Sequence, residues 1–198
     1  LQYERYTEEL AHSLIDEFIE SGRCDGAEQY AQQIPPRVIA HMIGVDPGMA
    51  DQFVIWVNGV LGAGLNDPEL RLKTREELLG FIGAEVAKRM EDPREDLLTE
   101  LLFMELDHPD AKITPEVVVG ITNLLIIAGI DTTWSSIGSS LWHLATHPAD
   151  RERLAAEPEI LPIAVEEFLR FYAPVTMARV AEHDVEFNED VHIERGDK

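Results

Sequence analysis

Residues 128–133 read AGIDTT, in the middle of an apolar stretch with helical spacing that runs from about residue 114 to residue 146. Gly129 costs a helix about 1 kcal/mol relative to alanine, and the two threonines carry hydroxyls that compete for backbone carbonyls. Asp131 adds a carboxylate directly after the apolar run. A helix with these residues at its centre is expected to be kinked or opened beside a ligand site. Small residues admit a flat ligand, and a carboxylate next to an alcohol can transfer protons.

The composition is that of one globular domain without a nucleic-acid or membrane partner. The chain has 198 residues, 45% of them hydrophobic, and a net charge of −22, which disfavours nucleic acid and anionic membranes. Cys24 is the only cysteine, so an internal disulfide is excluded and a cytoplasmic location is expected. The N-terminus lacks a signal-peptide pattern. The longest apolar run, residues 117–130, is shorter than the roughly 20 residues of a membrane span.

The pattern along the chain predicts a mainly α fold with a small β ribbon. Leu10, Leu14, Ile15 and Phe18 form a helical stripe that ends before Gly22. Proline follows a capping residue at several further helix starts. The expected helices cover residues 34–43, 50–61, 69–91, 97–106, 114–146, 149–157 and 159–172. Within the segment 69–91, we expect Leu72, Leu79, Ile82 and Val86 to point inward. Alternating apolar residues predict a ribbon over about 178–194, and residues 1–198 form a single domain segment.

Two other pairs of residues have the spacing of neighbours on a helix face. Glu167 and Arg170 stand at i and i+3, which is typical of an exposed ion pair, although apolar neighbours favour burial with further partners. His143 and His147 stand at i and i+4 and could hold zinc, but no convincing third ligand accompanies them. Arg179 is typical of a surface residue, or of a cation that meets an anionic ligand.

Taken in order, these motifs resemble the central segment of soluble bacterial cytochrome P-450 monooxygenases. AGxDTT at 128–133 is similar to the family's oxygen-activation helix, and Glu167-x-x-Arg170 is similar to its Glu-x-x-Arg pair. Pro174 followed by Arg179 resembles the segment that lines the active site and contacts a haem propionate. The sequences at 144–154 and 34–45 resemble the family as well, so the resemblance covers nearly the whole chain.

The resemblance implies roles for individual residues. Asp131 and Thr132 would be catalytic and deliver protons to dioxygen, and Glu167 with Arg170 would be a structural ion pair. The cofactor would be haem b, iron protoporphyrin IX, with Ala128 and Gly129 leaving room for oxygen and the porphyrin face and Arg179 holding a propionate. The substrate pocket would be lined by Leu124, Ile127, Val175, Thr176 and Met177.

The implied activity is insertion of one oxygen atom from dioxygen into a small apolar organic substrate. Electrons would come from NAD(P)H through a ferredoxin or flavin reductase. The family's cysteine haem ligand lies in a loop that follows every motif found here, and Cys24 stands in the wrong context to replace it. No metal ligand is therefore expected in this segment, which resembles a partial chain, incomplete at both ends. The alternative is a truncated, non-catalytic helical scaffold or binding module derived from that family.

Overall fold

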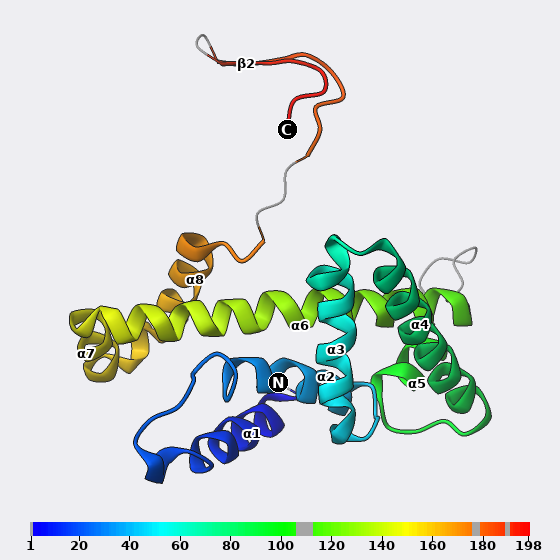
Figure 1. Cartoon of the computed structure of the whole chain (residues 1–198), viewed down its shortest axis with the longest axis horizontal. Helices are drawn as coiled ribbons and strands as arrows, with labels where there is room; N and C mark the ends of the chain where they lie inside the picture. The colour runs from blue at the N-terminus through cyan, green and yellow to red at the C-terminus, as the bar shows by residue number, and fades with distance from the viewer. Residues whose placement is uncertain (1, 106–112, 176–178, 189–190) are drawn as a thin grey trace.

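The computed structural model describes residues 2–105, 113–175, 179–188 and 191–198. Figure 1 shows helices arranged around one long central helix, α6. The helices are α1 (Glu4–Asp16), α2 (Ile34–Met42), α3 (Ala50–Leu61), α4 (Pro68–Glu91), α5 (Leu97–Leu102), α6 (Pro115–Thr146), α7 (Pro148–Ala156) and α8 (Leu161–Tyr172). Single 3₁₀ turns are η1 (Ile19–Ser21), η2 (Ala31–Gln33), η3 (Pro47–Met49), η4 (Ala63–Leu65) and η5 (Pro158–Ile160). The mainly α fold predicted from the sequence is confirmed.

Side-chain caps explain why three of the helices begin where they do. The Asp67 carboxylate accepts a hydrogen bond from the Leu70 amide at 3.0 Å, and Pro68 opens α4. Thr114 caps α6 in the same way, again directly before a proline. Asp96 caps α5 by accepting from the Thr99 amide at 2.9 Å. Each cap satisfies an amide that the first turn of a helix leaves without a partner.

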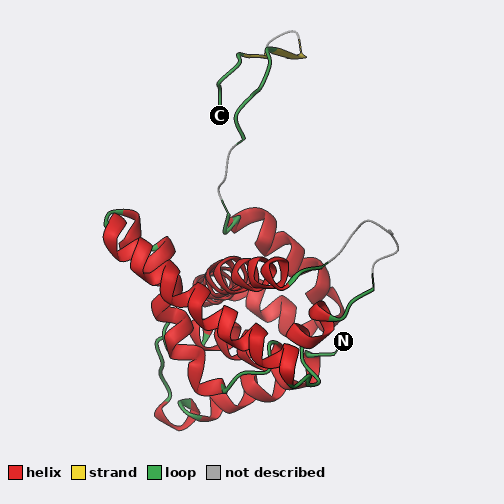
Figure 2. Cartoon of the chain, turned by 90° about the vertical axis from the view of Figure 1, so that its right-hand side faces the viewer, coloured by secondary structure: helices red, strands yellow, loops and turns green. Residues whose placement is uncertain are grey.

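The core is built on one face of α6. Its buried residues recur every fourth position, at Val118, Thr122, Ile126 and Ile130, and this face packs against α2, α3 and α4. Figure 2 shows α6 nearly end-on with the other helices around it. By length and composition α6 is also the one helix in the described ranges that could cross a bilayer. The central helix of a globular protein passes the same test, so the absence of a membrane span remains a prediction.

The inward face of α4 differs from the predicted one. Thr74, Leu78 and Ile82 are buried on α4, whereas Leu72 is 58% exposed and Leu79 is only partly buried. At 100° per residue, Leu72 and Leu79 lie on a neighbouring face of the helix, away from the line that packs inward. The expectation for these two leucines was wrong, while Ile82 and Val86 are buried as expected. Helix α5 ends at Leu102, earlier than predicted, and residues 106–112 lie outside the described ranges.

A buried cluster of charges lies where α2, α4 and α5 meet, and the sequence patterns did not reveal it. Arg89 has no exposed surface; its Nε donates to Asp96 at 2.8 Å, and it also pairs with Glu85. Its second terminal nitrogen donates to the carbonyls of Ile43 and Gly44, at 3.2 and 2.6 Å. These carbonyls end α2, so one guanidinium joins three helices.

The β ribbon is confirmed and lies apart from the helices. Strand β1 (Val185–Asn188) pairs antiparallel with β2 (Val191–Ile193), with Val185 opposite Ile193. Figures 1 and 2 both show the ribbon outside the helical body, beyond the end of α8. The fold therefore brings α6, α7 and α8 together but leaves the ribbon residues away from α6.

Candidate functional site

The AGIDTT segment lies in an unbroken helix. Helix α6 runs from Pro115 to Thr146 without interruption, so the predicted kink or opening is not observed. The Thr132 hydroxyl donates to the Ala128 carbonyl at 2.7 Å. Ser136 and Ser140 repeat this bond one and two turns later, each at 2.8 Å to the carbonyl four residues earlier. Bonds of this kind compete with the backbone and can bend a helix, but α6 keeps one continuous helical assignment across all three of them.

The face of α6 opposite the core carries an exposed apolar line. Leu124 is 65% exposed and Ala128 follows it one turn later. The same line begins at Val117 and Ile121, which are also exposed. A rotation of 100° per residue places Asp131 and Thr132 on either side of Ala128. The helix thus presents an acid, an alcohol and a small residue next to an apolar surface, with Ile127 half-buried at its edge.

Gly129 faces the core rather than this open surface. A Cβ at Gly129 would lie 3.1 Å from the Ile39 Cδ1 atom of α2 and 3.7 Å from Leu125 Cδ1. The missing side chain therefore allows α2 to pack closely on α6. Gly129 lies 100° around the helix from Ala128, and its implied role in leaving room for the porphyrin stays a prediction. On the open face, the small side chain of Ala128 is the one that leaves room above the helix.

The Asp131 carboxylate is half-buried beside the apolar line. Within the described part of the chain, no hydrogen bond or ion pair engages it. A carboxylate in this setting can accept a proton from a neighbouring donor and release it again. The Thr132 hydroxyl is committed as a donor to Ala128, but its lone pairs can still accept.

Glu167 and Arg170 form the predicted pair on α8. Two parallel bonds of 2.7 Å join the guanidinium to the carboxylate, and hydrogen bonding from Arg170 lowers the pKa of Glu167. The two side chains are 56% and 68% exposed, and α8 has no buried residue. In the described residues the pair is therefore exposed, which agrees with the exposed alternative, and its structural role stays a prediction.

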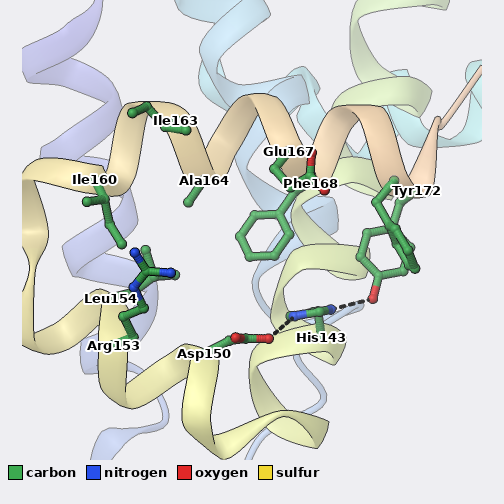
Figure 3. A pocket seen from close by; sticks show the side chains of 11 residues that line it. His143, Asp150, Arg153, Leu154, Ile160, Ile163, Ala164, Glu167, Phe168 and Tyr172 are labelled. Carbon is green, nitrogen blue, oxygen red and sulfur yellow. Dashed lines mark hydrogen bonds and ion pairs between the residues drawn. The ribbon is translucent and has the colours of Figure 1, made fainter.

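A pocket of about 440 Å³ lies between the end of α6, α7 and α8 (Figure 3). His143 is at its base, with Nδ1 2.7 Å from the Tyr172 hydroxyl and Nε2 2.9 Å from Asp150 Oδ2. The rings of His143 and His147 are stacked, with centroids 4.2 Å apart. Both ring nitrogens of His143 thus have protein partners. Among the described residues no group of three ligands suits a metal, so the zinc alternative gains no support.

The remaining predicted residues are not gathered at the open face of α6. Arg179 is exposed at the start of the ribbon segment, and Val175 is 46% exposed after α8. Thr176 and Met177 lie outside the described residues. Cys24 is exposed and lines a different groove of about 580 Å³, between the first helix and the C-terminal half of α6. The structure thus brings together Leu124, Ile127, Ala128, Asp131 and Thr132, and leaves Arg179 apart.

Comparison with known proteins identifies the fold. The sequence profile of the family described as Cytochrome P450 matches residues 69–198. The chain belongs to the cytochrome P450 family. It is 32% identical over 180 residues to 6-deoxyerythronolide B hydroxylase of Saccharopolyspora erythraea, covering 90% of this chain and 44% of that protein. It is 33% identical over 172 residues to vitamin D(3) 25-hydroxylase of Pseudonocardia autotrophica, covering 87% and 42%.

A solved structure of the family has the same arrangement of helices. The Bacillus subtilis cytochrome P450 PksS, of the bacillaene polyketide synthase, superposes with a TM-score of 0.88 at 29% identity. The match covers 99% of this P450 chain and 50% of that structure. The chain therefore spans about half the length of the relatives that it matches.

The open face of α6 fits one side of a haem group. This face is apolar over two turns. Its smallest side chain is that of Ala128, which leaves room for a flat porphyrin. The polar groups on this face, Asp131 and Thr132, are a carboxylate and an alcohol, and no cysteine lies there to supply the thiolate that the family implies. Cys24 lies in another groove and is not placed to supply a thiolate. The residues present fit the oxygen and substrate side of the group.

Proposed function

We propose that the protein containing this P450 segment is a haem-thiolate monooxygenase that hydroxylates an apolar organic substrate. The observation that carries the proposal is the position of Asp131 and Thr132, on either side of Ala128 on an exposed apolar face of α6. Haem b, when bound, supplies the activation of dioxygen. We further propose that residues 1–198 belong to a single domain and that the cysteine ligand lies beyond Lys198.

Thr132 and Asp131 act on protons in this proposal. The Thr132 hydroxyl is held by its 2.7 Å bond to the Ala128 carbonyl, one turn earlier in α6. Rotation about one side-chain bond releases that proton for donation, and the hydroxyl can then accept another. Asp131 is half-buried with its carboxylate unengaged within the described ranges, so it can return a proton from solvent to the alcohol.

The substrate side is apolar. Leu124 is exposed beside Ala128, with Ile127 at the edge of the same surface. We propose that Val175, Thr176 and Met177 complete the pocket and that Arg179 contacts a haem propionate. Two relatives are named as hydroxylases of 6-deoxyerythronolide B and vitamin D(3), which supports an apolar substrate. Electrons would come from NAD(P)H through a ferredoxin or flavin reductase in the cytoplasm.

The test uses the natural protein that contains this chain. The reduced protein with carbon monoxide is expected to show the strongly red-shifted Soret band of thiolate-ligated haem. In that protein, Thr132→Ala is expected to consume NAD(P)H without forming a matching amount of product, because proton delivery is lost. Val117→Ala on the same exposed line is the control, since it removes apolar surface without a proton donor. Coupling that is unchanged in Thr132→Ala contradicts the role of Thr132. Absence of haem binding favours the alternative, a non-catalytic scaffold or binding module.

A further inference from the structure

Three helices meet at one histidine. His143 lies in the last turn of α6, Asp150 in the first turn of α7, and Tyr172 is the last residue of α8. Figure 3 shows the imidazole between the other two side chains, with Nε2 2.9 Å from Asp150 Oδ2 and Nδ1 2.7 Å from the Tyr172 hydroxyl. We call these three residues the His143 junction. Among the described residues, the bond between His143 and Tyr172 is the one side-chain hydrogen bond that joins α6 and α8.

The chemistry of the partners determines which atom donates in each hydrogen bond of the junction. A carboxylate can only accept, so the Nε2 atom of His143 carries the hydrogen in its bond to Asp150. In the tautomer that donates from Nε2 alone, Nδ1 is an acceptor, to which the Tyr172 hydroxyl donates. The Phe168 ring lies against the same imidazole in an edge-type arrangement, with ring centroids 5.2 Å apart.

A strained residue follows the junction immediately. Ala173 has φ 37° and ψ 74°, the only non-glycine residue with positive φ among those described. This left-handed conformation costs an alanine about 1 kcal/mol or more, and it persists only where the surroundings hold it. It turns the chain out of α8 toward Pro174 and Val175. The chain direction at this point therefore depends on how firmly Tyr172 is held.

We infer that the His143 junction positions residues 173–175 after α8, and that His143 acts through Tyr172 as a positioning residue for the substrate pocket. Two independent features support this, the directed hydrogen bonds from α7 through α6 to α8 and the strained turn that begins at the next residue. The inference rests on the proposed function, which places Val175 beside the substrate.

The first test measures the junction itself and needs no haem. Nitrogen-15 NMR of the natural protein is expected to show His143 protonated at Nε2 and unprotonated at Nδ1. Tyr172→Phe and Asp150→Ala are each expected to raise the exchange rate of backbone amides in the last turn of α8 about fivefold, the effect of one lost hydrogen bond. The double variant is expected to fall well short of the product of the two effects, because both act through His143.

His147→Gln is the matched control. It removes the stacked neighbouring ring but none of the bonds to Asp150 or Tyr172, so the tautomer and the exchange rates should stay as they are in the parent protein. A His143 proton on Nδ1, or single effects that multiply in the double variant, overturns the inference.

The second test measures positioning. The probe is 4-phenylimidazole, whose imidazole binds haem iron while its phenyl ring enters the apolar pocket. Tyr172→Phe is expected to weaken its binding severalfold at full haem content, whereas His147→Gln leaves the affinity unchanged. Unchanged affinity in Tyr172→Phe, with faster exchange in α8, overturns the positioning role. If the protein binds no haem, the proposed function fails, while the NMR and exchange results still decide whether the junction exists.

Discussion

Arg89→Met is the perturbation with the largest expected effect on stability. The guanidinium has no exposed surface and bonds to Asp96, Glu85 and two carbonyls at the end of α2. Methionine fills much of the volume but leaves the two carboxylates without their shared cation. Removing one partner of a buried ion pair costs about 3–5 kcal/mol. For a chain of this size, each kcal/mol lowers the melting temperature by about 2–4 °C, so a decrease of roughly 6–20 °C is expected.

The assay is urea and thermal unfolding followed by helical circular dichroism at pH 7. Arg5→Met is the matched control, because Arg5 pairs with Glu9 at 2.8 Å with both side chains well exposed. An exposed pair of this kind contributes little to stability, so the control should unfold almost as the parent does. A change of less than about 1 kcal/mol in Arg89→Met would refute the reasoning, since it would mean that the carboxylates do not depend on Arg89.

The pH dependence of the free energy of unfolding gives a second test of the buried cluster around Arg89. Burial acts to raise the pKa of Glu85, but hydrogen bonds and charges from Lys88 and Arg89 outweigh it and hold the pKa below its usual range. The stabilisation from Glu85 is therefore present above the unfolded pKa of about 4.3 and is lost as pH falls through the lower folded pKa. The difference in stability between the parent and Arg89→Met should accordingly narrow below about pH 4. A difference that is constant from pH 7 to pH 3 contradicts the assigned role of Glu85.

Three further changes test other parts of the molecule. Asp131→Asn should slow turnover of the haem-loaded natural protein, because an amide does not relay protons, and a solvent isotope effect on the rate should rise; an unchanged rate argues against the role. Gly129→Leu should destabilise the chain by about 1–3 kcal/mol in urea unfolding, because the new side chain meets Ile39 across the α2–α6 contact; unaltered stability would show that the space is free. Ala173→Gly should stabilise the chain by about 1 kcal/mol, because glycine adopts φ 37° without strain; a loss of stability would contradict the strain.

Local sequence signals predicted the helices well because each signal acts within a few residues. Thr114 and Pro115 mark the start of α6, and Gly44, with φ 67°, ends the helix that was expected to stop there. The ordered motifs around Asp131 and Glu167 were enough to predict the family, which the comparisons confirm. The ranges of α3 and α6 agree with the predicted ones to within one residue.

The errors concern contacts between residues far apart in the chain. Arg89 and Asp96 look like ordinary surface charges in the sequence, and the packing of α4 and α5 against the end of α2, more than forty residues earlier, buries them. The close approach of Ile39 to Gly129, from ninety residues earlier in the chain, was likewise not visible in the sequence. Helical spacing fixes relative angles along one helix, but it does not tell which face meets the core.

The same contacts explain how α6 keeps polar residues at its centre without a break. Ile130 is the last of the fully buried residues on α6. Asp131 follows it directly and is only half-buried, so the polar residues come after the buried repeat has ended. Thr132 satisfies its own hydroxyl with a carbonyl of the same helix, and Gly129 allows close packing that offsets part of its low helix propensity. At its C-terminal end the helix is tied to α7 and α8 through His143. Asp131 and Thr132 therefore stand on a rigid element held on both sides, as a site that must place proton-transferring groups accurately requires.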